Sequence, residues 1–253
     1  MQSLPRDQVT SFHATFWGLC AAIVIGSQIG CASFKMPSLS RNPTVENASA
    51  AALTPSQIKL KSAVAEAAYN RGDVDQAIET YNEILRAHDD LIDVRHQVAL
   101  IHDKRGDFAK AQVQYQAILE RQPNDAKVLS DFGYSLYLQE SFDAAEQQLN
   151  AAVQADPRYL RARLNLGLLL ARTGRIDDAL SQFELSGLNE SQAHCNIAMV
   201  AAQQGDAQTA STAIKRCSVS SDTLLGENQQ ALANVIDKMT ARQSEIVTAA
   251  GTF

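Results

Sequence analysis

The chain has 253 residues, of which 45% are hydrophobic and 20% are charged, a composition that fits a folded protein of one or two domains. Its formal net charge is -6 at pH 7, and its Lys and Arg residues form no basic run. Binding to nucleic acid needs clustered cations, so the composition argues against nucleic acid as a partner. The sequence has no acidic run either, and bulk charge therefore identifies no partner.

The first 31 residues differ from those that follow. Residues 1–13 are mostly polar, whereas the stretch from Phe16 to Ile29 is mainly apolar. This run of about 14 residues is shorter than the roughly 20 that span a bilayer, and its length is typical of a signal-peptide core. We interpret residues 1–31 as a signal peptide and expect the protein to be exported.

The apolar run ends at Gly30 and Cys31, and a small residue before a cysteine at this place resembles the lipobox of bacterial lipoproteins. In that family the cysteine becomes the first mature residue, so the resemblance implies lipidation of Cys31. Gln28 stands where the family usually has leucine, and ordinary cleavage nearby or an uncleaved membrane anchor are the alternatives. Because Ala32 is not the aspartate of an inner-membrane retention signal, the resemblance implies an outer-membrane lipoprotein of the cell envelope that faces the periplasm.

Residues 32–54 are rich in Ser, Pro, Asn and Ala and show no helical or strand period, so we predict a flexible tether. Ordered structure should begin at Thr54, whose side chain can cap a helix. Pro55 suits the first turn of that helix, and Gln57 can reach back to the amide of the cap.

A pattern of paired small residues recurs through residues 55–222. Five times a small residue stands twelve positions before an alanine with a turn midway between them, and the first four copies recur every 34 residues. The pairs are Ala65 and Ala77, Ala99 and Ala111, Gly133 and Ala145, Gly167 and Ala179, and Ala198 and Ala210. The turns are Gly72-Asp73, Gly106-Asp107, Glu140-Ser141, Gly174-Arg175 and Gly205-Asp206. Helices whose axes approach to about 8 Å need Gly or Ala at the crossing, so each unit is predicted to be two closely packed antiparallel helices.

This pattern resembles the tetratricopeptide repeat, abbreviated TPR. Residues 92–125 and 126–159 match it best, and both end with the expected proline, Pro123 and Pro157. The other repeats are placed at 58–91, 160–190 and 191–222. The resemblance implies an all-α fold, a right-handed superhelical array of about five antiparallel helix hairpins.

The C-terminal part of the chain is predicted to close this array. Residues 223–245 carry apolar side chains at helical spacing, which predicts a capping helix over the last hairpin. The last residues, 246–253, are interpreted as a tail.

Two of the four cysteines, Cys195 and Cys217, lie beyond the leader. They stand ten residues before and twelve after the turn at Gly205, so in an antiparallel hairpin they should lie at nearly the same height. In an oxidising compartment a disulfide between them is one interpretation. The other is that both are small buried residues.

No catalytic, cofactor or metal site is predicted. His96 and His102 are six residues apart in one helix and point to different faces. His194 and Cys195 are adjacent, so their side chains diverge by about 100°. We therefore expect the protein not to be an enzyme and to need no cofactor.

In helical-hairpin arrays the first helices line a concave surface that binds peptides or partner proteins. The polar residues nine positions before each turn are Gln97, Asp131, Asn165 and Asn196. In related TPR proteins an asparagine ladder at this place binds the backbone of an extended peptide, which the resemblance implies most directly for Asn165 and Asn196. Amide side chains donate and accept hydrogen bonds together, as a peptide unit requires.

Cationic and apolar side chains flank this ladder. Lys127 and Arg161 lie thirteen residues before their turns, and Tyr134 and Leu168 lie six before. Together they predict a groove for a peptide with an acidic and an apolar element. The alternative is that the asparagines bond neighbouring turns, Tyr134 packs between helices and the two cations are solvated.

These features favour a non-catalytic scaffold that holds a protein or peptide partner and is tied to a membrane by a lipid. The chain resembles lipid-anchored TPR proteins of pilus assembly and outer-membrane biogenesis, which implies a role in assembling a surface or secretion apparatus. The alternative function is self-association through the first helix, near Leu60 and Val64, or through the terminal cap.

Overall fold

The computed structural model describes residues 53–217 and 223–250, and all of these lie in one compact unit, residues 48–253. The predicted signal peptide, Cys31 and the tether up to residue 52 lie outside the described residues. None of the described helices is long and apolar enough to cross a bilayer.

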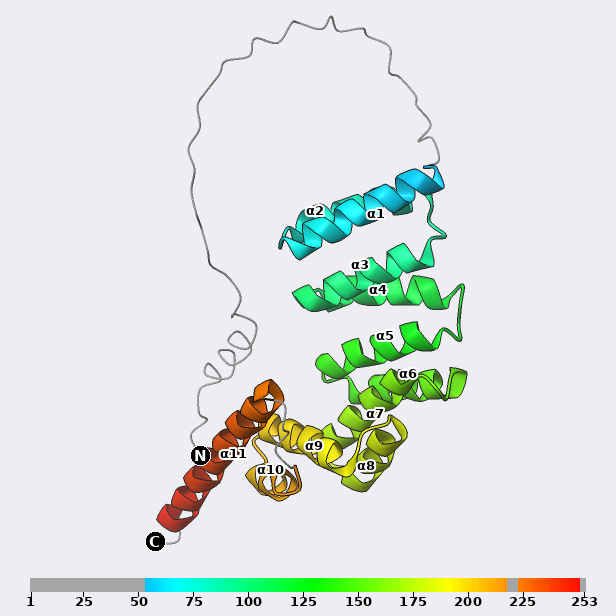
Figure 1. Cartoon of the computed structure of the whole chain (residues 1–253). Coiled ribbons are helices and arrows are strands. Elements are labelled where there is room, and N and C mark those ends of the chain that lie inside the picture. Colours follow the sequence, from blue (N-terminus) through cyan, green and yellow to red (C-terminus); the bar gives the residue numbers. More distant parts are fainter. Residues whose placement is uncertain (1–52, 218–222, 251–253) are drawn as a thin grey trace, which may run out of the picture. The chain divides into compact units, whose positions relative to one another are not determined.

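The described residues form eleven α-helices and no strand, and the first ten helices pair into five antiparallel hairpins (Figure 1). We call the odd-numbered helices of the hairpins first helices and the even-numbered ones second helices. The hairpins are α1 (Pro55–Asn70) with α2 (Val74–Ala87), α3 (Ile92–Arg105) with α4 (Phe108–Leu119), α5 (Ala126–Leu138) with α6 (Phe142–Ala155), α7 (Leu160–Arg172) with α8 (Ile176–Leu185), and α9 (Glu190–Gln204) with α10 (Ala207–Ile214). A last helix, α11 (Thr223–Ala250), follows. The all-α array of hairpins expected from the sequence is confirmed.

The start of the array follows from local hydrogen bonding. The Thr54 side chain accepts from the backbone N–H of Gln57 at 3.3 Å, and the Gln57 side-chain oxygen accepts from the Thr54 N–H at 2.8 Å. Pro55 is the first helical residue. This reciprocal capping box satisfies two amides that the helix itself leaves free, and it confirms the predicted first turn.

Each predicted turn between paired helices is confirmed by one residue with positive φ. Glycine supplies this backbone conformation in four of the five turns, for example Gly106 at φ 76°. In the third hairpin Glu140 adopts it at φ 59°, although a side chain makes this region costly by roughly 1–2 kcal/mol. The turn position is therefore set by the repeat even where glycine is absent.

The short step between the fourth and fifth turns also has a local cause. Helix α8 has only 10 residues, and it ends in a loop where Gly187 has φ 90°. Asn189 then starts α9 with a second capping box, in which Gln192 is the partner. Helix α9 begins at Glu190, one residue before the predicted boundary, because the cap lies at Asn189.

The small residues of the repeat are buried where paired helices meet, but two glycines face large residues. A Cβ added at Gly133 would lie 2.6 Å from Leu149 Cγ, and one added at Gly167 would lie 2.6 Å from Phe183 Cε1. Leu149 and Phe183 stand nine residues after their turns and are fully buried. Glycine in these two hairpins therefore makes room for the large side chain of the second helix.

Helix α11 packs on α9 and α10 and buries Ile236 completely, as a capping helix should. It is longer than predicted, because residues 246–250, which we assigned to a tail, continue the helix to Ala250. That assignment was wrong. Ala249 and Ala250 favour helix, and no glycine or proline stands between Gly226 and Gly251.

Candidate partner-binding surface

The predicted ladder lies on the first helices of four successive hairpins, and we call the surface around it the ladder face. Its four residues are not equally accessible. Gln97 on α3 is exposed, and Asn196 on α9 is half-buried. Asp131 on α5 and Asn165 on α7 are buried. Two of the predicted contact residues therefore lie beneath the surface.

The two buried ladder residues bind the preceding first helix. His96 Nε2 lies 3.0 Å from Asp131 Oδ2, which connects α3 to α5. Asn165 Nδ2 donates to Ser130 Oγ at 3.1 Å, which connects α5 to α7. In both contacts a residue ten positions before one turn meets the ladder residue of the next hairpin. These buried polar contacts fix the spacing and register of the first helices, because either partner left unpaired would be costly.

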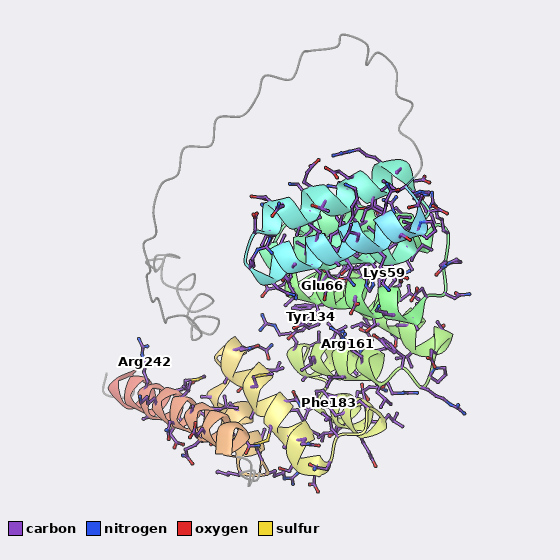
Figure 2. The ribbon with its side chains drawn as sticks, turned by 45° about the horizontal axis from the view of Figure 1, so that its top comes forward. Lys59, Glu66, Tyr134, Arg161, Phe183 and Arg242 are labelled. Atoms are coloured by element: carbon purple, nitrogen blue, oxygen red, sulfur yellow. A yellow bond between two sulfur atoms is a disulfide. The ribbon has the colours of Figure 1, made fainter. Side chains whose placement is uncertain are left out.

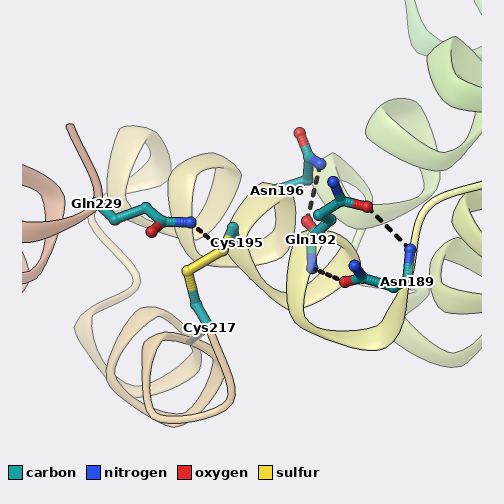
Figure 3. The surroundings of a disulfide bond; sticks show 6 residues. All are labelled: Asn189, Gln192, Cys195, Asn196, Cys217 and Gln229. Carbon is teal, nitrogen blue, oxygen red and sulfur yellow. Dashed lines mark hydrogen bonds between the residues drawn. A yellow bond between two sulfur atoms is a disulfide. The ribbon is translucent and has the colours of Figure 1, made fainter. Parts of the chain in front are cut away.

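The same contact is missing at Asn196 because the position opposite it is apolar. The residue ten positions before the fourth turn is Leu164. Asn196 Nδ2 instead donates to the carbonyl oxygen of Gln192 in its own helix at 2.9 Å (Figure 3). Its side-chain oxygen belongs to a half-buried residue and can accept a hydrogen bond from a partner.

Charged and apolar groups lie together in the middle of the ladder face. Lys127 and Arg161 are exposed on α5 and α7, one hairpin apart. Tyr134 and Leu168 on the same two helices are half-buried, and Figure 2 labels Tyr134 and Arg161. Tyr134 stacks on Tyr137 with ring centroids 5.7 Å apart, which limits its movement.

Of the two cations on this surface, Arg161 lies near a buried carboxylate. Its Nη2 lies 3.7 Å from Asp131 Oδ1, and more than half of its side chain is exposed. At that distance the pair is loose, so the guanidinium keeps donors that point to solvent. Lys127 enters no ion pair with another described residue.

A second group of buried polar side chains connects the helices behind the ladder, and it was not predicted from the sequence. Asp103 on α3 accepts from the Tyr115 hydroxyl at 2.7 Å and from the Ser135 hydroxyl at 2.6 Å. Burial raises the pKa of Asp103, although these two hydrogen bonds favour its charged form. Burial and the neighbouring Asp103 also raise the pKa of Tyr115. This group ties α3, α4 and α5 together.

Cys195 and Cys217 form a disulfide that joins α9 to the residues just after α10 (Figure 3). Their Cα atoms are 4.9 Å apart, which fits their expected equal height in the hairpin. Gln229 Nε2 of α11 lies 3.4 Å from Cys195 Sγ. The bond therefore lies where the last hairpin meets the final helix.

No other site competes clearly with the ladder face in the part of the chain that the structure describes. That part contains no group of three or more His, Cys, Asp and Glu residues able to hold a metal ion. An open depression of about 350 Å³ lies on α2, α3 and α4, away from the ladder. Its lining residues are Asn82, Leu85, Arg86, Arg95 and Gln114. Two of them, Arg95 and Gln114, are already hydrogen-bonded to each other at 2.9 Å.

The repeat register also places residues on this face that were not predicted to lie there. Lys59 on α1 stands thirteen positions before its turn, like Lys127 and Arg161. Glu66 on α1 and Met199 on α9 stand six positions before theirs, and both are exposed. Reading these positions through all five repeats would have found them.

Comparison with known families gives the same assignment along the chain. Residues 99–159 and 130–193 match a model described as tetratricopeptide repeat, and residues 64–90 match a second model of the same description. The first two matches together run from the middle of α3 to the start of α9 and so cover part of the second hairpin and all of the third and fourth. Residues 64–90 cover most of the first.

Among curated proteins the chain is similar to the human Protein O-mannosyl-transferase TMTC1, with 28% identity over 139 residues. The mouse protein of the same name is 27% identical over 136 residues. These matches cover 53% and 52% of this chain, but they span only 16% and 14% of the two relatives. The likeness is therefore confined to a small part of each relative.

Two solved structures show the same fold. PilF from Pseudomonas aeruginosa has a TM-score of 0.53 and 20% identity, with 78% of this chain and 93% of that chain covered. MamA from Desulfovibrio magneticus RS-1 has a TM-score of 0.52 and 20% identity, with 63% and 92% covered. At this identity the similarity concerns the arrangement of the helices alone.

Proposed function

Because this chain is a tetratricopeptide repeat protein, we propose that it is a non-catalytic scaffold that binds one peptide or protein segment along its ladder face. Proteins built from such repeats bind peptide or protein partners, and function must still be argued from the individual surface. The observation that carries the proposal is the group formed by Lys127, Arg161, Tyr134 and Leu168. It places two exposed cations beside partly exposed apolar side chains on two adjoining helices.

The chemistry of this group selects the ligand. Lys127 and Arg161 attract carboxylates, and Arg161 offers a planar set of donors suited to them. Tyr134 and Leu168 present apolar surface that gains from being covered. We therefore propose that the ligand is an extended segment with an acidic residue close to an apolar one.

Gln97 and Asn196 mark the two ends of the accessible ladder. The exposed Gln97 can donate to and accept from a peptide backbone, and the side-chain oxygen of the half-buried Asn196 can accept from one. Asp131 and Asn165 take the supporting role, since their bonds to His96 and Ser130 hold the helices that carry the cations. A preformed surface of this kind lowers the cost of ordering on binding.

We propose that this scaffold works in the bacterial cell envelope. The support is the apolar run Phe16 to Ile29 and the lipobox-like Gly30 and Cys31, which favour export and an outer-membrane lipid anchor facing the periplasm. A role in assembling a pilus, secretion system or outer-membrane complex fits a tethered scaffold. The fold shared with PilF is compatible with such a role but is too distant in sequence to identify it.

The transferase activity in the name of TMTC1 does not extend to this chain in our proposal. The matched segment spans 16% of the human protein.

The proposed lipid anchor predicts a diacylglycerol linked through a thioether to Cys31 at the mature N-terminus. Mass spectrometry of protein prepared from membranes tests this prediction, and Cys31→Ser is the control.

Partner binding is tested by substitutions that leave the buried His96–Asp131 and Asn165–Ser130 contacts intact. Lys127→Ala, Arg161→Ala and Asn196→Ala together should reduce capture of the partner from detergent-solubilised envelopes at least about tenfold, since each removes a direct contact. The matched control is Lys110→Ala, Arg121→Ala and Gln147→Ala, three exposed residues outside the ladder face. An unchanged partner profile for the ladder variant would refute the proposed surface.

A further inference from the structure

The first helix of the array exposes residues whose counterparts in every other hairpin are buried. Twelve positions before the turn, the buried residues are Val94, Val128, Ala162 and Ala193. Eight positions before the turn, they are Val98, Phe132, Leu166 and Ile197. In α1 these two positions are Leu60, which is 66% exposed, and Val64, which is 44% exposed.

The difference follows from the way hairpins stack. Each later first helix packs on the helices of the preceding hairpin, as α3 packs on α2 and α7 packs on α5 and α6. Among the described helices α1 is the first, so none of them covers this side of it. Leu60 and Val64 are one turn apart and form an apolar strip that is continued by the exposed Ala67.

Two opposite charges flank this strip on one side of α1. Lys59 and Glu66 are seven residues apart, which brings them to the same side of the helix within about 20°. Both are exposed, and neither forms an ion pair with another described residue. Lys61, on the opposite side, is already paired with Glu83 of α2 at 2.5 Å. Figure 2 labels Lys59 and Glu66.

We propose that this face binds α1 of a second copy of the chain, antiparallel, about a two-fold axis near Ser62. Reversing the helix about that point places Leu60 against Val64 of the partner copy and Val64 against its Leu60. A two-fold axis perpendicular to both helices keeps each flank on the same side, so Lys59 of each copy meets Glu66 of the other. The interface is closed by this symmetry, and it contains the Lys59–Glu66 ion pair twice.

The charge pattern favours a second copy over an unrelated apolar partner. Lys59 stands three residues before Ser62 and Glu66 four residues after it, so each charge of one copy lies close to the opposite charge of the other and the face is complementary to itself. A head-to-tail contact between copies has no comparable site, because α11 already covers α9 and α10 at the other end. Pairing through α1 therefore gives a dimer and does not extend into a filament.

The dimer should be weak, because each copy contributes little more than one helix. Interfaces of this kind lie at the small end of specific interfaces, below about 1,200 Å² in total, and typically dissociate in the micromolar range. Two copies tethered to one membrane would meet at a higher effective concentration than in solution.

The experiment is sedimentation equilibrium of the compact unit 48–253 and of the full chain in detergent, from about 1 µM to about 1 mM. We expect the average mass to rise toward that of a dimer in both. Leu60→Asp with Val64→Asp should abolish this rise in average mass. Because both side chains are exposed, the two substitutions should leave the helical content unchanged. The control is Val113→Asp with Leu185→Asp, which alters two similarly exposed apolar residues and should dimerise as the wild type does.

Charge reversal tests the antiparallel geometry. Lys59→Glu alone and Glu66→Lys alone should each raise the dissociation constant about tenfold, since two equivalent contacts become repulsive. The two together should restore it to within about twofold of the wild type. A monomer at all concentrations, a dimer that survives both aspartates, or a double reversal without recovery overturns the proposal. A monomeric full chain beside a dimeric unit 48–253 would also overturn it, since residues 1–52 would then cover the face.

Discussion

The two ends of the helical array meet solvent in different ways. At the C-terminal end α11 lies on α9 and α10 and buries Ile236 completely, and the Cys195–Cys217 disulfide joins the last hairpin at this contact. At the N-terminal end the described helices leave Leu60 two-thirds exposed. A position that is core in four hairpins is thus surface in the first. In this fold, whether a side chain is buried depends more on the presence of a neighbouring hairpin than on the type of residue.

Helix α11 covers its end by taking the place of another first helix. Contacts between successive first helices join residues 35 positions apart, as between His96 and Asp131. Gln229 of α11 reaches Cys195 over 34 positions. The final helix therefore continues the register of the ladder contacts without a complete sixth hairpin, and the array stops at its C-terminal end.

Breaking the disulfide should have the largest effect on the covered end. Its cysteines are 22 positions apart, and opening such a loop should lower the free energy of opening α10 and α11 by about 3 kcal/mol. Hydrogen exchange of the unit 48–253 with and without reductant measures this, and exchange in α1 and α2 should not change. Cys195→Ala with Cys217→Ala should behave as the reduced protein whether reductant is present or not. Two free thiols in the unreduced, denatured unit would contradict the prediction.

Removing the anchor of the final helix should come next. Ile236→Ala leaves a cavity under α11 and should lower the free energy of unfolding by about 2 to 3 kcal/mol. This loss is at the low end of the range for a buried isoleucine, because a terminal helix can shift to fill the space. Urea unfolding of the unit 48–253 checks this. Val235→Ala changes the neighbouring residue, which is about half exposed, and should cost less than about 0.5 kcal/mol. Equal losses for the two variants would show that α11 does not pack through Ile236.

The open end is tested by truncating equivalent positions. Val128→Ala, twelve residues before the third turn, should cost about 2 kcal/mol because it is buried between hairpins. Leu60→Ala at the same position of the first hairpin should cost less than about 0.5 kcal/mol when measured on dilute, monomeric protein. A large loss from Leu60→Ala under those conditions would mean that α1 is covered within a single chain.

Acid should lower the stability of the covered end, and this should be the smallest of the four effects. Burial, aided by Arg216, lowers the pKa of His194 from its ordinary 6.5, while Glu190 opposes the shift. The folded state then binds this proton less readily than the unfolded state, so the stability of α9 and α10 is full above pH 6.5 and falls as pH drops toward the lowered pKa. Hydrogen exchange across this range should show the loss, and His194→Gln should flatten the dependence. An unchanged slope in His194→Gln would assign the effect to another group.

Features that depend on a few neighbouring residues could be predicted from the sequence. The capping box at Thr54 joins residues three positions apart, and the turn at Gly106 needs only a residue that tolerates positive φ. The helix end near residue 245 was missed because the apolar period fades before the helix does. Continuation to Ala250 depends on the absence of a breaking residue, which is a weaker signal than a cap.

The candidate site could be located from the sequence but not described. The register placed Asp131 and Asn165 on the correct helices, yet their buried partners are 35 positions away. A signal existed, since His96 and Ser130 are polar at the position ten before the turn where Leu164 is apolar. Its meaning depends on which residues of two hairpins meet, and one hairpin alone does not reveal it.

The sequence by itself determined the number of hairpins, the place of their turns and the helices that carry the ladder, because these follow from a repeating pattern and from local backbone preferences. Only the tertiary structure decided which ladder residues are buried and bonded to the preceding helix, and which face solvent. It also decided that Gly133 and Gly167 make room for Leu149 and Phe183, and that Leu60 and Val64 are exposed. These outcomes depend on what packs against each side chain, and a neighbouring hairpin supplies that at a distance the local sequence does not encode.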